Sequence, residues 1–385
     1  MPLEYGLSCF SPAPGRENGK IYYFVPQEVD LTKPAGLFIF MHGGDRNTPD
    51  TAPFDNYLSP EKGSLRPHID HIPFIVAAAS APEEIDGKRW NRAAAVAALE
   101  NIIADASSRA LIDHDRIIIG GHSMGGFGAY HLGQIFADRA AGVWLSSGAW
   151  QIADFRSFYG TPVYILHGKY DCAASYKEFH KEPRHHDWCG VSFGRSADEL
   201  MTAYGVEHVY DEHDAGHGLR WEAAQLAFRR FLKWAEKQKR QPYAAKCALI
   251  TPRGSADPEM FDAPRSRYLE LLEAGDGTIL YDKIHQTGPN IAWTVDDLMQ
   301  QDYELQTIAM AGSRIIAENC GNNHFKVSAE NVKRFAIYLA PEMGDLTRPF
   351  TVDCQKHGSF TCLPEPLEIP EKDYSAKIII GLKQA

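Results

Sequence analysis

Hydrophobic runs and helical patterns alternate along the first 240 residues. The runs are short and almost continuously apolar, which is typical of strands that a parallel sheet buries on both faces. They begin near residues 21, 37, 73, 116, 141, 162 and 207. Between them, apolar residues recur every three or four positions and predict helices over 92–108, 125–137, 195–204 and 219–239. This alternation predicts an α/β fold with a mostly parallel, doubly wound sheet.

The pattern changes near Arg240, where a charged segment interrupted by proline is typical of a linker. Beyond it, short strand-like runs separated by turn residues predict an antiparallel β-sandwich. Asp276-Gly277 lies between two such runs, which predicts a β-hairpin. We therefore expect an α/β catalytic domain over residues 1–240 and a β-rich accessory domain over 241–385.

The composition is that of a folded globular protein and excludes several partners. Of 385 residues, 44% are hydrophobic and 23% are charged. The net charge of −11 argues against a broad surface for nucleic acid or anionic lipid, since both select clustered Lys and Arg. No apolar run reaches the roughly 20 residues that span a bilayer, and the N-terminus lacks a secretory pattern. A cytoplasmic location without membrane contact is the expectation, unless a signal has been removed.

The cysteines predict free thiols. There are seven, an odd number at low density, and no CxxC pair suggests a structural zinc site. If the protein were exported, Cys172 with Cys189 and Cys354 with Cys362 would be the pairs to test as disulfides, because they are close in sequence.

The most informative segment runs from an apolar strand through Gly121-His122-Ser123-Met124-Gly125 into a helical pattern. A G-x-S-x-G motif in this position forms a sharp turn that exposes the serine hydroxyl. The helix that follows supplies free N–H groups and a partial positive charge. Ser123 is therefore the candidate nucleophile.

A nucleophilic serine needs a base, and the base needs a carboxylate to orient it. Asp171 follows a predicted strand, and His217 lies in a glycine-flanked loop before a predicted helix. The order serine, acid, histidine is that of α/β-hydrolases. Asp154, after the preceding strand, is the alternative acid, whereas Asp214 is too near His217 along the chain.

A second loop predicts an oxyanion hole. The sequence HGGD, from His42 to Asp45, follows a buried strand directly. We expect the backbone N–H of Met124 and one from Gly44 or Asp45 to meet the negative charge of a tetrahedral intermediate. His42 is expected to hold its loop through hydrogen bonds rather than to transfer protons.

The segments HGGD, GHSMGGFGAYHLG, LHGKYD and AGHG make the region 21–239 resemble the α/β-hydrolase superfamily. Within it, the chain resembles the branch of feruloyl esterases, acetylxylan esterases and polyhydroxybutyrate-depolymerase-like enzymes, which borders the prolyl-oligopeptidase-like hydrolases. The resemblance implies Ser123 as nucleophile, Asp171 as acid and His217 as base, with no cofactor. The region 311–352 also looks like a C-terminal segment attached to some predicted esterases of this branch.

Three aromatic residues are the candidates for substrate contact: Trp90, His186 and Trp188. The last two lie in the loop 172–194, which is longer than the family pattern leads us to expect. A buried core position for Trp90 is an equal alternative, and the loop could instead pack on the second domain. The loop's histidines match no ligand spacing of known metal sites, so we expect no metal.

These residues predict a serine hydrolase that cleaves a carboxylic ester, with an acyl or feruloyl ester on a carbohydrate as the candidate substrate. A prolyl-oligopeptidase-like peptidase is the alternative enzyme. A binding protein of the same fold is the non-enzymatic alternative and would be expected to lack part of the triad. We expect a small-molecule or carbohydrate-linked partner and no nucleic acid, and the sequence is compatible with a homo-oligomer.

Overall fold

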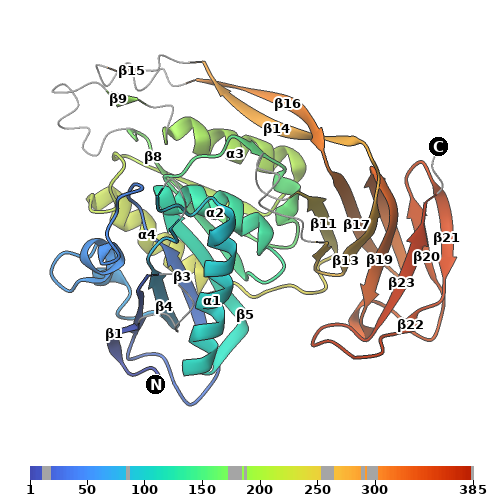
Figure 1. Cartoon of the computed structure of the whole chain (residues 1–385), viewed down its shortest axis with the longest axis horizontal. Helices are drawn as coiled ribbons and strands as arrows, with labels where there is room; N and C mark the ends of the chain where they lie inside the picture. The colour runs from blue at the N-terminus through green and yellow to red at the C-terminus, as the bar shows by residue number, and fades with distance from the viewer. Residues whose placement is uncertain are drawn as a thin grey trace.

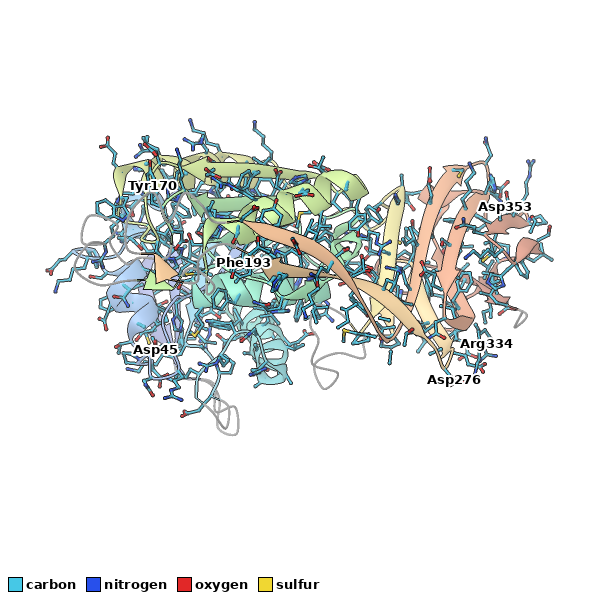
Figure 2. All side chains as sticks on the ribbon, turned by 90° about the horizontal axis from the view of Figure 1, so that it is seen from above. Asp45, Tyr170, Phe193, Asp276, Arg334 and Asp353 are labelled. Atoms are coloured by element: carbon cyan, nitrogen blue, oxygen red, sulfur yellow. The ribbon has the colours of Figure 1, made fainter. Side chains whose placement is uncertain are left out.

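The computed structural model describes residues 1–10, 19–83, 87–171, 184–185, 189–252, 264–287, 291–292 and 302–382. Figure 1 shows an α/β part, coloured blue to yellow, beside a β-rich part coloured orange to red. A long hairpin extends from the β-rich part across the α/β part. Figure 2 shows the same division from above, with Asp45 and Tyr170 in one part and Arg334 and Asp353 at the far end of the other.

The α/β part is built on an eight-stranded sheet with the order β1-β2-β4-β3-β5-β6-β8-β10. All neighbours from β4 to β10 are parallel, whereas β1 and β2 are antiparallel. The sheet is mostly parallel, as the apolar runs predict; β1 has no such run because its residues alternate between partly buried and exposed. The strands are β1 Gly6–Phe10, β2 Ile21–Val25, β3 Ala35–Met41, β4 Phe74–Ala79, β5 Ile112–His122, β6 Gly142–Ser146, β8 Val163–Gly168 and β10 His208–His213.

Helices cover both faces of this sheet. One hydrophobic cluster includes Leu99, Leu132 and Phe193 of the first three helices, and a separate cluster includes Phe228 and Phe231 of the fourth. Burial on both faces explains why the central strands are continuous apolar runs. The helices are α1 Ala93–Arg109, α2 Met124–Ile135, α3 Val191–Tyr204 and α4 Glu222–Ala235, with short helical turns η1 Pro53–Leu58, η2 Arg66–His68, η3 Phe155–Phe158 and η5 Pro341–Met343.

The β-rich part is a sandwich of two five-stranded sheets that share one hydrophobic core. Leu249 and Phe325 of one sheet lie in that core with Phe335 and Ile337 of the other. Pairing is antiparallel throughout, except between β18 and β20. One sheet has the order β11 Lys246–Thr251, β17 Ser313–Gly321, β18 His324–Glu330, β20 Phe350–Cys354 and β21 Gly358–Cys362, and the other β12 Arg265–Ser266, β13 Leu269–Ala274, β19 Val332–Leu339, β23 Ala376–Gly381 and β22 Glu365–Pro366.

The two parts also share buried contacts. Ala248 and Ile250 of β11 belong to the hydrophobic cluster of the α/β part, although their neighbours along the strand face the sandwich core. The division into domains at residue 240 therefore stays a prediction.

The predicted hairpin at Asp276-Gly277 is wrong. β13 pairs with β19, and the strand after the turn, β14 (Thr278–Gln286), pairs with β16 (Tyr303–Ala311) in a different sheet. The side chain of Asn331 accepts a hydrogen bond from the Gly277 N–H at 2.8 Å and donates one to the Gly277 carbonyl at 2.9 Å. The turn therefore leads the chain from the sandwich into another sheet, where β14 pairs with strands from other parts of the chain.

The β14–β16 hairpin forms an arm that lies along α3 (Figure 1). Its strand β14 pairs with the short strand β7, Ile152–Ala153, of the α/β part. Tyr204 on α3 donates to Asp282 of the arm at 2.7 Å, and Tyr303 donates to Glu199 at 2.7 Å. Beyond the arm, β15 Ile291–Ala292 pairs with β9 Arg184–His185. The β-rich part thus contacts the predicted substrate loop, as the alternative reading of that loop expects.

The six described cysteines are free thiols, Cys354 and Cys362 among them. The register of β20 and β21 sets Cys354 opposite Gly358 and Cys362 opposite Phe350, so the two cysteines lie at opposite ends of the ladder. Cys172 is outside the described residues.

Within the described ranges, no helix combines the length and the apolar composition needed to cross a bilayer.

Candidate active site

Ser123 occupies a strained turn between β5 and α2. Its backbone has φ 59° and ψ −120°, a conformation that non-glycine residues seldom adopt. The glycines on either side allow this turn because the chain approaches itself closely there. A Cβ at Gly121 would lie 2.3 Å from the Gly125 carbonyl oxygen, and one at Gly125 would lie 1.9 Å from that of Met41. The turn therefore presents the Ser123 hydroxyl at the carboxyl end of the sheet.

The structure brings Ser123, His217 and Asp171 into one line of hydrogen bonds. His217 Nε2 is 2.8 Å from Ser123 Oγ, and His217 Nδ1 is 2.7 Å from Asp171 Oδ1. Asp171 is fully buried and His217 is partly exposed. With its proton on Nδ1, donated to Asp171, the imidazole has a lone pair on Nε2 to accept the serine proton. The arrangement can therefore generate a serine nucleophile.

Two histidines hold the buried Asp171 carboxylate. His167 Nε2 lies 3.1 Å from Oδ2 and 2.8 Å from the backbone oxygen of Cys189, while His217 faces Oδ1. Burial pushes the pKa of Asp171 upward, but the charge of His217, the proximity of His167 and the hydrogen bond to His217 outweigh it and hold that pKa well below its usual range. The acid is therefore ionised and fixed in orientation.

The pKa of His217 is raised, whereas that of Asp171 is lowered. Burial lowers the pKa of His217, but the Asp171 carboxylate more than compensates and raises this pKa well above the ordinary value. The nearby His122 ring, 5.0 Å away between centroids, has a pKa well below the ordinary value because of its burial and of His217. His122 Nδ1 also lies 3.1 Å from Ser146 Oγ. Of these two imidazoles, His217 is thus the one placed to take up a proton.

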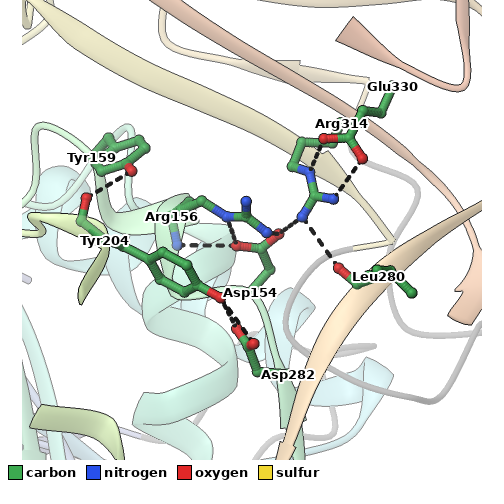
Figure 3. A network of polar contacts seen from close by, with 8 residues as sticks. All are labelled: Asp154, Arg156, Tyr159, Tyr204, Leu280, Asp282, Arg314 and Glu330. Atoms are coloured by element: carbon green, nitrogen blue, oxygen red, sulfur yellow. Dashed lines mark hydrogen bonds and ion pairs between the residues drawn. The ribbon is translucent and has the colours of Figure 1, made fainter. Parts of the chain in front are cut away.

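Asp154, the alternative acid, lies elsewhere in a buried ionic network (Figure 3). Arg156 approaches its two oxygens at 2.7 and 2.8 Å, and Arg314 of β17 approaches Oδ2 at 2.5 Å. Arg314 also pairs with Glu330 at 2.8 Å. The Asp154 carboxylate therefore joins the α/β part to the sandwich, while Asp171 faces His217.

Replacing Asp154 with asparagine is expected to lower the free energy of unfolding by about 3 kcal/mol. The change leaves the partly buried Arg156 without its counter-charge and the buried Arg314 with only the half-exposed Glu330. Urea unfolding followed by circular dichroism measures the change. Glu100→Gln is the matched control, since its ion pair with Arg139 is about half exposed and is expected to contribute almost nothing. Equal unfolding curves for the two variants would contradict a structural role for the network.

The predicted oxyanion loop is only partly free to act. Met124 is the first residue of α2, where a helix leaves backbone N–H groups without intrahelical acceptors. The Asp45 N–H, by contrast, donates to Thr48 Oγ1 at 2.7 Å, and the Gly43 N–H donates to Tyr57 Oη at 2.9 Å. Of the two alternatives in the loop, Gly44 therefore fits better than Asp45 as the second donor.

His42 ties this loop to its neighbour. Its Nε2 accepts a hydrogen bond from the Ala81 N–H at 2.9 Å, and Nδ1 lies 2.9 Å from the Gly43 oxygen. Burial lowers the pKa of His42 to about 4, so the ring is neutral and serves as a fixed link between two loops.

The structure contradicts a substrate-binding role for Trp90. This side chain is fully buried, with its ring 5.9 Å from that of His42, and its Cβ lies 2.4 Å from where a Cβ at Gly128 would be. A side chain packed against helix α2 in this way has no face left for a ligand. His186 and Trp188 lie outside the described residues.

A cavity of about 340 Å³ adjoins the aligned residues and includes three side chains that the sequence did not point to: Tyr57, Arg220 and Trp221. His122 and Gly218, neighbours of Ser123 and His217 along the chain, also line it. Arg220 and Trp221 come shortly after the AGHG loop, and this proximity to His217 in the sequence could have pointed to them. Tyr57 lies in the segment between β3 and β4, where no motif marks it.

A larger cavity of about 680 Å³ lies on the sandwich, where Lys246, Lys326 and Asp353 are among its lining residues. Its lining includes no chain neighbour of Ser123 or His217, whereas the lining of the smaller cavity includes His122 and Gly218. The smaller cavity is therefore the candidate substrate site.

The strand order together with the serine turn after β5 identifies the α/β-hydrolase fold. The sequence matches no family model and no curated protein. Among solved structures, the chain is similar to a thermostable esterase (20% identity, 61% of this chain and 63% of that chain, TM-score 0.44). It is also similar to an S-formylglutathione hydrolase from Agrobacterium tumefaciens (15% identity, 61% of this chain and 97% of that chain, TM-score 0.45). A ferulic acid esterase is similar as well (14% identity, 61% of this chain and 99% of that chain, TM-score 0.44).

Proposed function

We propose that this protein is a serine hydrolase that cleaves carboxylic esters through an acyl-enzyme intermediate. The observation that carries the proposal is the unbroken line of hydrogen bonds from Ser123 Oγ through His217 to Asp171, at 2.8 and 2.7 Å. A binding protein that merely kept the fold would have no need for this alignment or for a serine held at φ 59°.

In the proposed reaction, His217 Nε2 takes the Ser123 proton as Oγ attacks the ester carbonyl. The ionised Asp171 stabilises the imidazolium that forms, and the N–H groups of Met124 and Gly44 receive the negative oxygen. His217 then protonates the departing alcohol, which leaves an acyl group on Ser123. A water molecule, deprotonated by the same imidazole, releases the acid and restores the serine.

For the substrate, we propose an ester with an aromatic or sugar group close to the scissile bond. The candidate cavity offers the partly exposed ring of Trp221 for stacking and the exposed Arg220 for polar contacts, while Tyr57 is a buried part of its wall. Feruloyl esters and acylated carbohydrates combine such groups. A peptidase of the same fold remains the alternative, and it would favour amide over ester substrates.

A substrate panel tests the reaction and its selectivity together. We expect the protein to hydrolyse acetyl, butyryl and feruloyl esters while leaving aminoacyl amides intact. Trp221→Ala is expected to raise KM for the feruloyl ester about tenfold, a loss of roughly 1.4 kcal/mol, and to leave acetyl ester kinetics nearly unchanged. Preference for the amides would favour the peptidase. Equal effects on both esters would remove Trp221 from substrate recognition.

The pH dependence follows from the charge partner of His217. The base must be neutral to accept a proton, so kcat/KM is expected to fall tenfold per pH unit below the pKa of His217. Because Asp171 raises that pKa, the fall begins above the ordinary histidine value of about 6.5. Asp171→Asn removes the raising charge and is expected to move the acid limb to lower pH. Rates of ester hydrolysis from about pH 5 to 9 measure this; a limb unmoved by Asp171→Asn would contradict the assignment.

A further inference from the structure

A cysteine thiol lies against the acid and the base. Cys189 Sγ is 3.7 Å from Asp171 Oδ1 and 3.8 Å from His217 Nδ1, which are themselves 2.7 Å apart. The Cys189 carbonyl accepts a hydrogen bond from His167, so its backbone is fixed on the same side of the carboxylate. Among the described residues, these three side chains form a group with the composition and proximity of a metal site. The reaction proposed above gives the thiol no step.

We propose that Cys189, His217 and Asp171 bind a thiophilic divalent cation, Zn²⁺ being the prime candidate, and that this binding reversibly switches off the hydrolase. Thiolate, imidazole and carboxylate are the three ligand types that zinc takes in proteins. Such a site would be inhibitory, in contrast to a catalytic zinc, because its ligands are the groups that the serine needs.

The spacing of the three atoms fits a tetrahedral ion. Bond lengths of about 2.3 Å to sulfur and about 2.0 Å to nitrogen and oxygen put the ligand atoms about 3.6 Å apart for each sulfur pair and about 3.3 Å apart for nitrogen and oxygen. The observed sulfur distances of 3.7 and 3.8 Å are already close to this. The 2.7 Å separation of His217 Nδ1 and Asp171 Oδ1 has to widen by about 0.6 Å. The fourth position is left for water.

Binding would block catalysis through the tautomer of His217. The Cys189 thiol releases its proton to solvent, and the imidazole proton moves from Nδ1 to Nε2 so that Nδ1 can donate its lone pair to the ion. Nε2, 2.8 Å from Ser123 Oγ, then carries a hydrogen and has no lone pair to accept the serine proton. The inhibition rests on the proposed function, whereas the binding itself does not.

Cobalt absorption tests the binding without any need for activity. Co²⁺ is titrated into Ser123→Ala protein, and a thiolate-to-cobalt band in the near ultraviolet that saturates at one ion per chain is the expected result. Adding Cys189→Ser to that background is expected to remove the band and weaken binding at least about tenfold. Cys320→Ala, which removes an exposed free thiol on the sandwich, is the matched control and should keep the band. A band that survives Cys189→Ser, or none at all, would overturn the site.

Kinetics with buffered Zn²⁺ test the inhibition. The active protein is expected to lose ester hydrolysis at micromolar free zinc and to regain it with a chelator. In Cys189→Ser and Cys189→Ala, each compared with its own metal-free rate, the inhibiting concentration should rise at least about tenfold. A cobalt band with no hydrolysis of any ester would leave the metal site standing and reject the proposed function. Hydrolysis with unchanged zinc sensitivity in both variants would support the proposed function and reject the metal site.

Discussion

Replacing Ser123 with alanine is expected to lower kcat for ester hydrolysis by about 10⁶-fold, as removal of a serine nucleophile does in enzymes of this chemistry. The reason is geometric: Ser123 Oγ is the hydroxyl that His217 Nε2 approaches, at 2.8 Å. A fluorophosphonate probe, which reacts with activated serines, is expected to label the wild-type chain once and the variant not at all. Mass spectrometry of the labelled peptide locates the adduct.

Ser147 provides the control for this prediction. It is a buried serine with φ 45° at the end of the neighbouring strand β6, so its replacement by alanine changes a similar backbone without touching the hydroxyl beside His217. We expect Ser147→Ala to keep its label and most of its activity. A labelled Ser123→Ala, or an unlabelled wild type, would refute the nucleophile.

Asparagine at position 171 is expected to lower kcat by about 10³–10⁴-fold with little change in KM. The variant keeps the shape of the side chain, but its amide cannot balance the charge of the imidazolium. The amide can also donate to His217 Nδ1, which favours the tautomer with hydrogen on Nε2 and removes the base. Steady-state kinetics on an acetyl ester separate the two parameters.

Asp154→Asn is the matched control, because it makes the same change at the alternative acid. Its carboxylate is committed to Arg156 and Arg314, so kcat is expected to stay within about twofold at temperatures where the variant is folded. If Asp154→Asn were inactive and Asp171→Asn active, the acid would be wrongly assigned.

Local patterns indicated most of the strands and helices of the α/β part. Strands buried on both faces have to be continuously apolar, so the run at 21–25 already has the bounds of β2. The serine turn is equally local, because strand, glycines and helix follow one another within a few residues. The order of serine, acid and histidine, together with the loops that hold them, then singled out Asp171 before any distance was known.

The partners of distant segments were decided only by the tertiary structure. Asp276-Gly277 has residues typical of a hairpin turn, yet the strands on either side of it belong to different sheets. β13 pairs with β19 and β14 pairs with β16, while Asn331 binds the turn itself. Nothing near Trp90 in the sequence distinguishes a pocket wall from a residue packed on α2. Such outcomes depend on interactions between segments far apart in the chain, and these interactions produce no periodic pattern in the sequence.

The sequence thus indicated the buried strands, the serine turn and the candidates Ser123, Asp171 and His217, since strands, turns and glycine-flanked loops leave local patterns in the chain. Folding decided what surrounds them: Asp154 as a link to the sandwich, an arm along α3, and Cys189 beside the acid and base. A thiol at position 189 has no motif to mark it. It lies just before α3, and the hydrogen bond from His167 to its carbonyl oxygen fixes it beside Asp171.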